Sequence, residues 1–282
     1  MSRVDEYQRN GAVVLRDVVS PEEIEILRRG IDAVVERPSQ RAKVASSFDD
    51  PGFFIEDFCR WRDIEEFASF ISNSQLRLIA SELMQSTTVV HYHDHVLVKE
   101  PGTRQRTPWH QDQPYYDVEG RQNVSFWIPV DPVPIDTCLE LVAGSHLGPW
   151  RMPRSFLDQE AKWFPEGSLV EMPDFEALGD SAGLDNGPKI LRWELEPGDA
   201  IAFHMLTIHG APGVSGSRRR RVFSWRVLGD DMVYAHRPWV TSPDLGAVIS
   251  TEVDQRRNGE PLTGDWFPQL WPPPTPKNHR KS

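Results

Sequence analysis

The sequence predicts a mainly β fold, in which a double-sheet barrel is covered by helices. Helical patterns occur before residue 86, and short β-branched or alternating segments separated by turn residues follow it. Hydrophobic residues make up 39% of the 282 residues and charged residues 26%, so the chain has enough apolar material for a core and too little charge for a disordered protein. Short strands of this spacing are typical of barrels and jelly rolls.

The N-terminal part predicts a strand followed by a helix with a clear start. Ser20 suits the N-cap, Pro21 suits the first helical turn, and Glu23 completes a capping box with Ser20. A second helix is expected over about residues 74–85, where apolar residues recur at helical spacing. In the first helix the apolar positions are Ile24, Leu27, Ile31 and Val34.

Later segments predict strands because they are β-branched, alternate in polarity, or both. Pro-Gly, Gly-Ser and glycine-rich turns separate them. These segments are residues 87–100, 123–130, 189–194, 200–208 and 220–228.

Segments near the middle and at the end of the chain interrupt this pattern. Residues 147–188 are rich in Trp, Phe, Pro and acidic residues without a regular period, and a long irregular insertion in a compact barrel is often an active-site lid. Residues 259–282 are rich in proline, and we expect a C-terminal tail there. Residues 1–258 are expected to form a single domain that contains the lid-like insertion.

Charge and cysteine content limit the partners and the compartment. Lys plus Arg is 31 and Asp plus Glu is 42, giving a formal net charge of −11, which argues against nucleic-acid and anionic-membrane partners. Cys59 and Cys138 are too few for a disulfide framework or a thiolate zinc site. We therefore expect a cytoplasmic protein whose partner is a small-molecule substrate. The composition leaves the oligomeric state open.

His110 and Asp112 are the strongest candidates for metal ligands. Side chains at positions i and i+2 of a strand point to one face, so the imidazole and the carboxylate can meet at one ion. His209, at a predicted strand end 97 residues after Asp112, offers a third ligand. Two histidines and one carboxylate form the facial triad of non-haem Fe(II) oxygenases. The ordinary alternative is a histidine hydrogen-bonded to Asp112 and another histidine that merely ends a strand.

A run of arginines follows His209. The open positions of such a triad suit a 2-oxo acid and O2, and the remote carboxylate of a 2-oxo acid needs a cation. Residues 218–221 lie 9 to 12 residues after His209, on a strand that would return beside it. One of these guanidinium groups can bind the carboxylate, and at least two of the four are expected to face solvent. Arg226 is expected to pair with substrate, or with Asp230 or Asp231.

Several motifs are distinctive when taken together. They are Trp-His-Gln-Asp at 109–112, Cys-Leu-Glu-Leu-Val-Ala-Gly-Ser-His at 138–146, Pro-Gly-Asp-Ala at 197–200 and His-Met-Leu-Thr-Ile-His-Gly-Ala-Pro at 204–212. With the opening segment at 10–18, they resemble the phytanoyl-CoA dioxygenase-like family of Fe(II)- and 2-oxoglutarate-dependent oxygenases. The resemblance spans about residues 7–232.

This resemblance implies a double-stranded β-helix (jelly-roll, cupin-like) core and a set of functional residues. It implies that His110, Asp112 and His209 hold iron, with Fe(II), 2-oxoglutarate and O2 as cofactors and ascorbate as a reductant in vitro. Alternation along the predicted strand is consistent with Arg220 as the arginine that binds the cosubstrate, because the Arg220 side chain would point to the same face as Ser224. The residues implied to bind the cosubstrate are Arg220, Trp127 and Thr107.

Candidate substrate-binding residues lie around this centre. His95 is the nearest polar candidate on the strand that precedes the metal motif. Tyr115 and Tyr116 follow the motif directly, at the expected mouth of the site. Trp150 lies in the expected lid, where an aromatic ring can enclose substrate and exclude water.

The interpretation is therefore a dioxygenase that hydroxylates a C–H bond of a small-molecule metabolite and releases succinate and CO2. Asp112 disfavours halogenation, because related halogenases carry Gly or Ala at this position. One alternative is a metal enzyme of the same fold that does not use 2-oxoglutarate, such as a cupin-like isomerase or dioxygenase. Another is a non-catalytic small-molecule-binding barrel. A demethylase acting on nucleic acid or histones is disfavoured by the charge.

Overall fold

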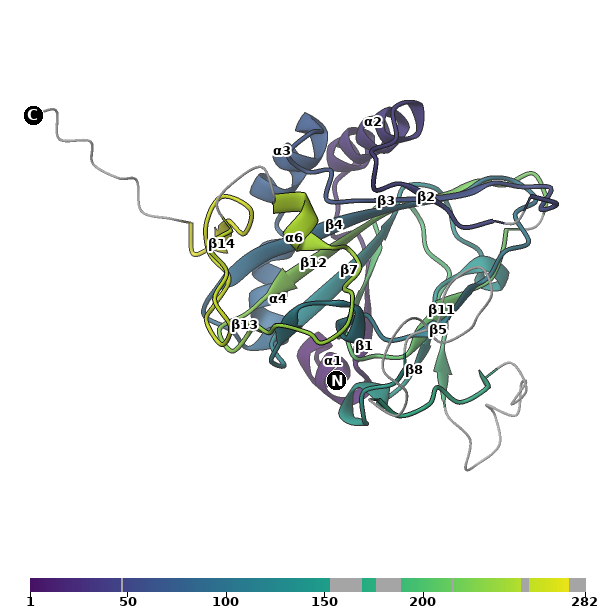
Figure 1. Cartoon of the computed structure of the whole chain (residues 1–282). Coiled ribbons are helices and arrows are strands. Elements are labelled where there is room, and N and C mark those ends of the chain that lie inside the picture. Colours follow the sequence, from purple (N-terminus) through teal and green to yellow (C-terminus); the bar gives the residue numbers. More distant parts are fainter. Residues whose placement is uncertain (47, 153–168, 176–188, 215, 250–253, 274–282) are drawn as a thin grey trace, which may run out of the picture.

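The computed structural model describes residues 1–46, 48–152, 169–175, 189–214, 216–249 and 254–273. A large and a small antiparallel sheet face each other, with helices against the outer side of the large sheet (Figure 1). This arrangement confirms the predicted jelly roll with helical cover.

The large sheet has eight strands in the order β1-β10-β7-β12-β4-β3-β2, with β14 also paired to β4. Its centre is β12, which pairs with β4 on one side and with β7 on the other. The strands are β1 (Ala12–Leu15), β2 (Lys43–Val44), β3 (Phe54–Phe58), β4 (Val89–Lys99), β7 (Asn123–Pro129), β10 (Ala200–Phe203), β12 (Arg220–Leu228) and β14 (Gln269–Trp271).

The small sheet has the order β5-β11-β8-β9. It is formed by β5 (Thr107–His110), β8 (Glu140–Val142), β9 (Ile190–Leu191) and β11 (His209–Ala211), and a separate pair joins β6 (Val118–Glu119) to β13 (Val233–Tyr234). Apolar side chains of both sheets meet between them in a cluster that includes Leu141, Phe203 and Val222. The two sheets are therefore held together around the space in which the candidate ligands lie.

The helices are α1 (Arg3–Asn10), α2 (Pro21–Glu36), α3 (Glu65–Asn73), α4 (Leu76–Met84) and α6 (Leu245–Ile249). The predicted capping box of α2 is present, because Ser20 Oγ accepts from the Glu23 amide and the Glu23 carboxylate accepts from the Ser20 amide. Leu27 of α2 and Phe67 of α3 are fully buried in the cluster that contains Phe223 of β12. The outer face of the large sheet is thus covered, which leaves its inner face for a cavity.

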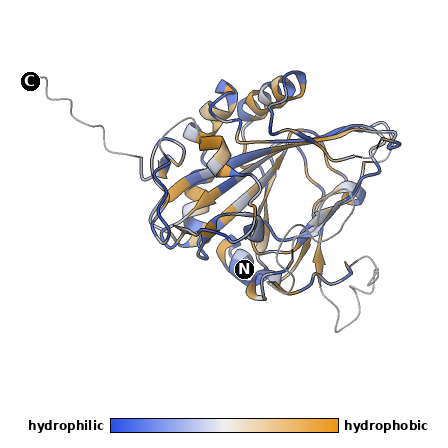
Figure 2. Ribbon diagram, viewed as in Figure 1, coloured by the Kyte–Doolittle hydropathy of each residue, from blue (hydrophilic) through white to orange (hydrophobic). Residues whose placement is uncertain are grey.

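Helices and strands both carry hydrophilic and hydrophobic segments (Figure 2), as expected for elements with one buried and one exposed face. Among the described residues, no helix combines the length and the hydrophobicity that a membrane crossing requires.

The strand predicted over residues 200–208 is wrong at its C-terminal end. β10 ends at Phe203, and His209 begins β11 in the opposite sheet. The reason is local: the amides of Leu206 and Thr207 bond back to His204, through its Nδ1 and its carbonyl, and this turn carries the chain from one sheet to the other. The strand predicted over 189–194 is likewise reduced to Ile190–Leu191.

The boundary expected at residue 258 needs correction. β14, inside the predicted tail, pairs with β4 between Trp271 and Val89, and Leu262, Phe267 and Leu270 are buried. The folded unit therefore continues to this strand, because these apolar side chains cover the N-terminal end of β4. Residues 274–282 lie outside the described residues.

Most of the expected lid also lies outside the described residues, namely 153–168 and 176–188. In the described part of this segment, Arg151 and Val170 form an isolated β-bridge. Met172 packs against Trp109 and Val142 of the small sheet.

Candidate metal centre

His110 and Asp112 converge, although not by the strand geometry expected for them. His110 is the last residue of β5, and Asp112 lies beyond the strand with helical backbone angles at the start of the 3-10 turn Gln113–Tyr115. The amides of Asp112 and Gln113 both bond to the Met205 carbonyl, which fixes this corner. The carboxylate therefore turns back toward the imidazole from a loop instead of alternating along a strand.

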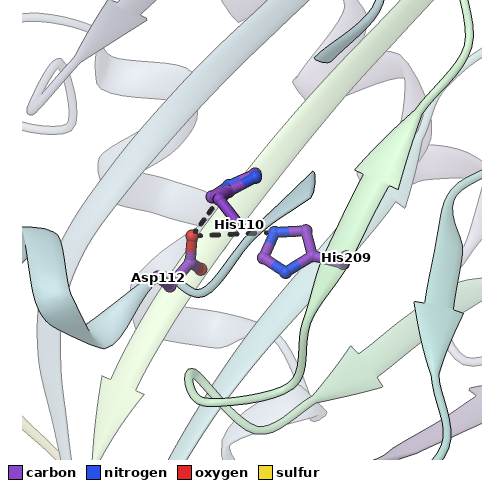
Figure 3. A group of neighbouring side chains, drawn as sticks. All are labelled: His110, Asp112 and His209. Carbon is purple, nitrogen blue, oxygen red and sulfur yellow. Dashed lines mark ion pairs between the residues drawn. The ribbon is translucent and has the colours of Figure 1, made fainter. Parts of the chain in front are cut away.

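His209 reaches the same point from the neighbouring strand, since β11 pairs with β5 and places His209 opposite His110. Asp112 Oδ1 lies 3.6 Å from His110 Nε2 and 3.7 Å from His209 Nε2, and the three side chains point toward one another (Figure 3). One ligand atom from each residue lies within 4.8 Å of the others, and all three residues are buried. This set has the spacing of a metal site.

Hydrogen bonds to the backbone select the nitrogen that each histidine presents. His110 Nδ1 lies 2.8 Å from the Pro108 carbonyl and His209 Nδ1 lies 2.9 Å from the Thr207 carbonyl. A carbonyl only accepts, so each Nδ1 carries the proton and each Nε2 presents a lone pair. Those lone pairs face the Asp112 carboxylate oxygen, which is also an acceptor. A cation among these atoms satisfies all of them, so the residues fit a divalent metal.

The second oxygen of Asp112 is held from behind by residues of the large sheet. Asp112 Oδ2 accepts from Ser125 Oγ at 2.9 Å and from Arg226 Nη2 and Nε at 3.2 and 3.3 Å. Oδ1 is therefore the oxygen left to bind a metal, as a single-oxygen ligand. The expectation that Arg226 pairs with Asp230 or Asp231 is wrong, while a contact between Arg226 and substrate stays a prediction, since Arg226 also lines the cavity. Strand register places Arg226 opposite Ser125, directly behind the ligand carboxylate.

The electrostatics favour an ionised Asp112 and a neutral His209. Burial by itself would raise the pKa of Asp112, but Arg226 and the two imidazoles hold that pKa well below its usual range. Burial, and next the neighbouring His110, lower the pKa of His209 to about 3. These are the protonation states in which carboxylate and imidazole bind metals.

A cavity of about 780 Å³, counting the part of its mouth open to solvent, contains this centre. The predicted alternation on β12 is confirmed, because Arg220, Val222, Ser224 and Arg226 all line it. Arg219 and Arg221 instead form ion pairs away from the cavity, with Glu100 and Asp131.

Arg220 is a buried guanidinium that lines the cavity. It is 5% exposed, and it donates to the Thr137 carbonyl and, at 3.3 Å, to the Pro212 carbonyl. Within the described part of the chain no carboxylate forms an ion pair with it. Burial lowers its pKa to about 10, so it remains a cation at neutral pH and is suited to an anion.

The other predicted site residues divide into two groups. Trp127, Thr107, His95, Tyr115 and Tyr116 all line the cavity. Trp150 does not appear among the described residues of its lining, and the Arg237 guanidinium lies 4.9 Å from the centre of its ring.

The cavity also contains residues that the sequence did not point to. Glu56 and Phe58 come from β3, and Lys99 comes from the end of β4. Lys99 Nζ donates to the carbonyls of Gln105, Ala211 and Pro212, which suits a cation that holds three segments together. The available signal for β3 was the aromatic and β-branched content of Phe53-Phe54-Ile55 and Phe58 after the turn residues Pro51-Gly52.

Other histidines have structural contacts. His91 Nδ1 accepts from Trp225 Nε1 at 2.9 Å, and His146 and His204 bond to backbone carbonyls of Gln8 and Arg121. Within the described residues, the only group of His, Cys, Asp or Glu with metal-ligand spacing is His110, Asp112 and His209.

Comparison with known sequences gives a family match. The family model described as phytanoyl-CoA dioxygenase matches residues 7–222. A protein from Caenorhabditis elegans described as a probable phytanoyl-CoA dioxygenase is 22% identical over 257 residues, which cover 80% of this chain and 74% of that protein.

Comparison with solved structures supports the fold. The non-heme alpha ketoglutarate dependent epimerase SnoN from nogalamycin biosynthesis is 20% identical, covers 97% of this chain and 96% of its own, and superposes with a TM-score of 0.72. The carbocyclase SnoK from the same biosynthesis gives 0.70 at 21% identity, covering 96% of each chain. EctD from S. alaskensis, solved with 2-oxoglutarate and 5-hydroxyectoine, gives 0.63 at 18% identity, covering 93% of this chain and 86% of its own.

Proposed function

Because the chain belongs to the phytanoyl-CoA dioxygenase family, whose members use Fe(II), 2-oxoglutarate and O2, we propose that it hydroxylates a C–H bond of a small-molecule metabolite. The reaction would release succinate and CO2. His110, Asp112 and His209 are the proposed iron ligands, and Arg220 is the proposed partner of the remote carboxylate of 2-oxoglutarate.

The observation that carries this proposal is the convergence of the three ligand atoms. Two imidazole lone pairs and one carboxylate oxygen face one point, each held by a hydrogen bond to its other polar atom. Such a triad occupies one face of an octahedral ion and leaves the opposite positions open. An iron–2-oxoglutarate centre supplies the oxidising power for attack on an unactivated C–H bond, and the protein supplies orientation and a dry site.

The roles of the chain's own residues follow from their contacts. Ser125 and Arg226 keep Asp112 ionised and limit it to one oxygen toward the metal. Arg220 would bind the remote carboxylate directly, through hydrogen bonds donated by its guanidinium group. Tyr115 and Tyr116, both buried beside the centre, would exclude water from the reacting bond.

The test uses 2-oxoglutarate alone, since uncoupled turnover does not require the substrate. Protein loaded with Fe(II) should convert 2-oxoglutarate slowly to succinate under ¹⁸O2, with one ¹⁸O atom in the succinate carboxylate. Asp112→Ala should release none above the protein-free blank, whereas Asp131→Asn, outside the cavity, should match the wild type. Succinate without ¹⁸O, or equal turnover by Asp112→Ala, would refute the assignment.

Hydroxylation itself is tested once a substrate has been identified by substrate-stimulated succinate release. The product should then carry one ¹⁸O atom. A product without incorporated oxygen would identify stereoinversion or ring formation at the same centre instead.

A further inference from the structure

Lys43 lies at the rim of the cavity and is not used by the proposed iron and 2-oxoglutarate sites. The residue is exposed, and its ammonium group lies 5.3 Å from the centre of the Phe58 ring. It also donates to Ser242 Oγ at 3.2 Å. Phe58 and Ser242 both line the cavity, so an exposed cation stands at the entrance. Within the residues that the structure describes, no carboxylate forms an ion pair with Lys43.

Ser242 places a hydroxyl group next to this cation. An ammonium group has three donors, and a hydroxyl group can donate one hydrogen bond while it accepts another, so the two groups together can donate to one carboxylate. The Ser242 amide donates to the Tyr115 carbonyl at 2.8 Å, which holds Ser242 in place. The Tyr115 ring in turn lies 5.9 Å from the His110 ring, measured between ring centres. The rim is therefore connected to the metal centre by a short stretch of cavity wall.

The cavity wall next to this rim is largely aromatic. Phe58 is stacked on His95, with ring centres 4.0 Å apart and planes 19° apart, and Tyr115 and Tyr116 are both buried. Burial lowers the pKa of His95, so this ring adds no charge at neutral pH. A wall of this kind suits an apolar part of a ligand whose polar group stays at the rim.

The charges inside the cavity also favour an anionic ligand. Among the described residues that line it, the cations outnumber the acids by one; the charged residues are Lys99, Arg220, Arg226, Glu56 and Asp112. Asp112 is paired with Arg226, and Glu56 raises the pKa of Lys99 against the larger lowering by burial and by the neighbouring arginines. Fe(II) and the dianion of 2-oxoglutarate would add opposite charges that cancel, so the occupied cavity would keep its positive excess. A cleft lined by an excess of one charge attracts ligands of the opposite charge.

We propose that Lys43 and Ser242 form a substrate-anchoring subsite, which binds a carboxylate at the rim while an apolar chain of the substrate extends toward the metal centre. This inference rests on the proposed function. The two side chains match a carboxylate because both can donate hydrogen bonds to it and Lys43 adds the opposite charge. The substrate class is therefore an apolar carboxylic acid. A protonated amine in the same place would be repelled by Lys43.

The experiment uses three fragments with one alkyl chain: octanoate, octanol and octylamine. Each is titrated by calorimetry, under anaerobic conditions, into protein saturated with Fe(II) and 2-oxoglutarate. In the wild type, octanoate should bind about fivefold more tightly than octanol, as expected for an ion pair at an exposed rim, and octylamine should bind most weakly. Lys43→Gln should bring octanoate and octanol to within about twofold of each other. Lys43→Glu should make octylamine the tightest of the three, and Lys43→Arg should retain the wild-type order.

The matched control is Arg29→Gln, which removes another exposed cation, on the outer helix α2. This variant should retain the full preference for octanoate, because Arg29 does not line the cavity. The proposal is overturned if the wild type binds octanol as tightly as octanoate, if Lys43→Gln or Lys43→Glu retains the octanoate preference, or if no fragment binds.

The same samples separate this subsite from the proposed function. The charge-transfer absorbance of the Fe(II)–2-oxoglutarate complex should be the same in the wild type and in Lys43→Gln, and it should stay constant as octanoate is added. If the absorbance is absent from the wild type, the proposed function fails, whatever the order of the fragment affinities. If octanoate lowers the absorbance, it competes with 2-oxoglutarate at Arg220, and the anchoring subsite at Lys43 is refuted.

Discussion

Replacing Arg220 by methionine isolates the contact proposed for the remote carboxylate of 2-oxoglutarate. Methionine retains an unbranched side chain of similar length but removes the charge and the donors. The guanidinium is 5% exposed, and the partners that it has now are the neutral carbonyls of Thr137 and Pro212. A bound carboxylate would therefore be its charged partner.

The expected loss follows from this burial. Breaking a buried ion pair by removing one partner costs about 3–5 kcal/mol, and each 1.4 kcal/mol is about a factor of ten in Kd. Lys99 lies close enough for its pKa to be lowered by Arg220, after the larger effect of burial, and it can partly compensate the carboxylate. We therefore take the lower end, and expect the Kd of 2-oxoglutarate to rise by about a hundredfold.

The assay compares 2-oxoglutarate with 2-oxopentanoate, which replaces the remote carboxylate by a methyl group. Both are titrated anaerobically into Fe(II)-loaded protein. The wild type should prefer 2-oxoglutarate by about a hundredfold, and Arg220→Met should bind both about equally, because the variant lacks the guanidinium that distinguishes the carboxylate from the methyl group. Arg219→Met, whose side chain pairs with Glu100 on the outside, is the control. A wild-type preference that survives in Arg220→Met would refute the assignment.

Further predictions concern stability. Arg226→Met should lower the unfolding free energy of the metal-free protein by about 3 kcal/mol in urea, because Asp112 Oδ2 stays buried without its cation; an unchanged midpoint would contradict this. Burial lowers the pKa of His91 to about 3, so between pH 6 and 4 the unfolded chain binds a proton that the folded one does not, and stability falls with acidification. His91→Gln should reduce that slope by up to about 1.4 kcal/mol per pH unit, and identical slopes would refute the argument. Leu27→Ala, at a fully buried site, should cost about 2–5 kcal/mol, and a loss under 1 kcal/mol would show that α2 does not anchor the sheet.

Local signals in the sequence predicted what is determined locally. The start of α2 depends on Ser20 and Glu23, which are three residues apart, and the capping box is present as predicted. The alternation of β12 separates Arg220 from its neighbours Arg219 and Arg221 without knowledge of any other strand. The family motifs located the three candidate ligands, since each lies within a short segment of fixed spacing.

What depends on register between distant segments was not predictable. Arg226 faces Asp112 because β12 pairs with β7, and the sequence offered Asp230 and Asp231 as nearer acids. Those acids instead accept from backbone amides, Asp230 from Thr87 and Asp231 from Gln122. β14 was assigned to a tail because the proline content near it suggested an irregular segment. Its pairing with β4 joins positions about 180 residues apart, which no local pattern reveals.

Locating the iron tests the central claim most directly. Crystals grown anaerobically with Fe(II) and 2-oxoglutarate would be measured on both sides of the iron absorption edge, and the anomalous difference map would show where the ion lies. The account predicts a single strong peak bounded by His110 Nε2, Asp112 Oδ1 and His209 Nε2, with 2-oxoglutarate extending from it to Arg220. An iron peak elsewhere in the cavity, or one bound by Glu56 and His95 instead, would contradict it.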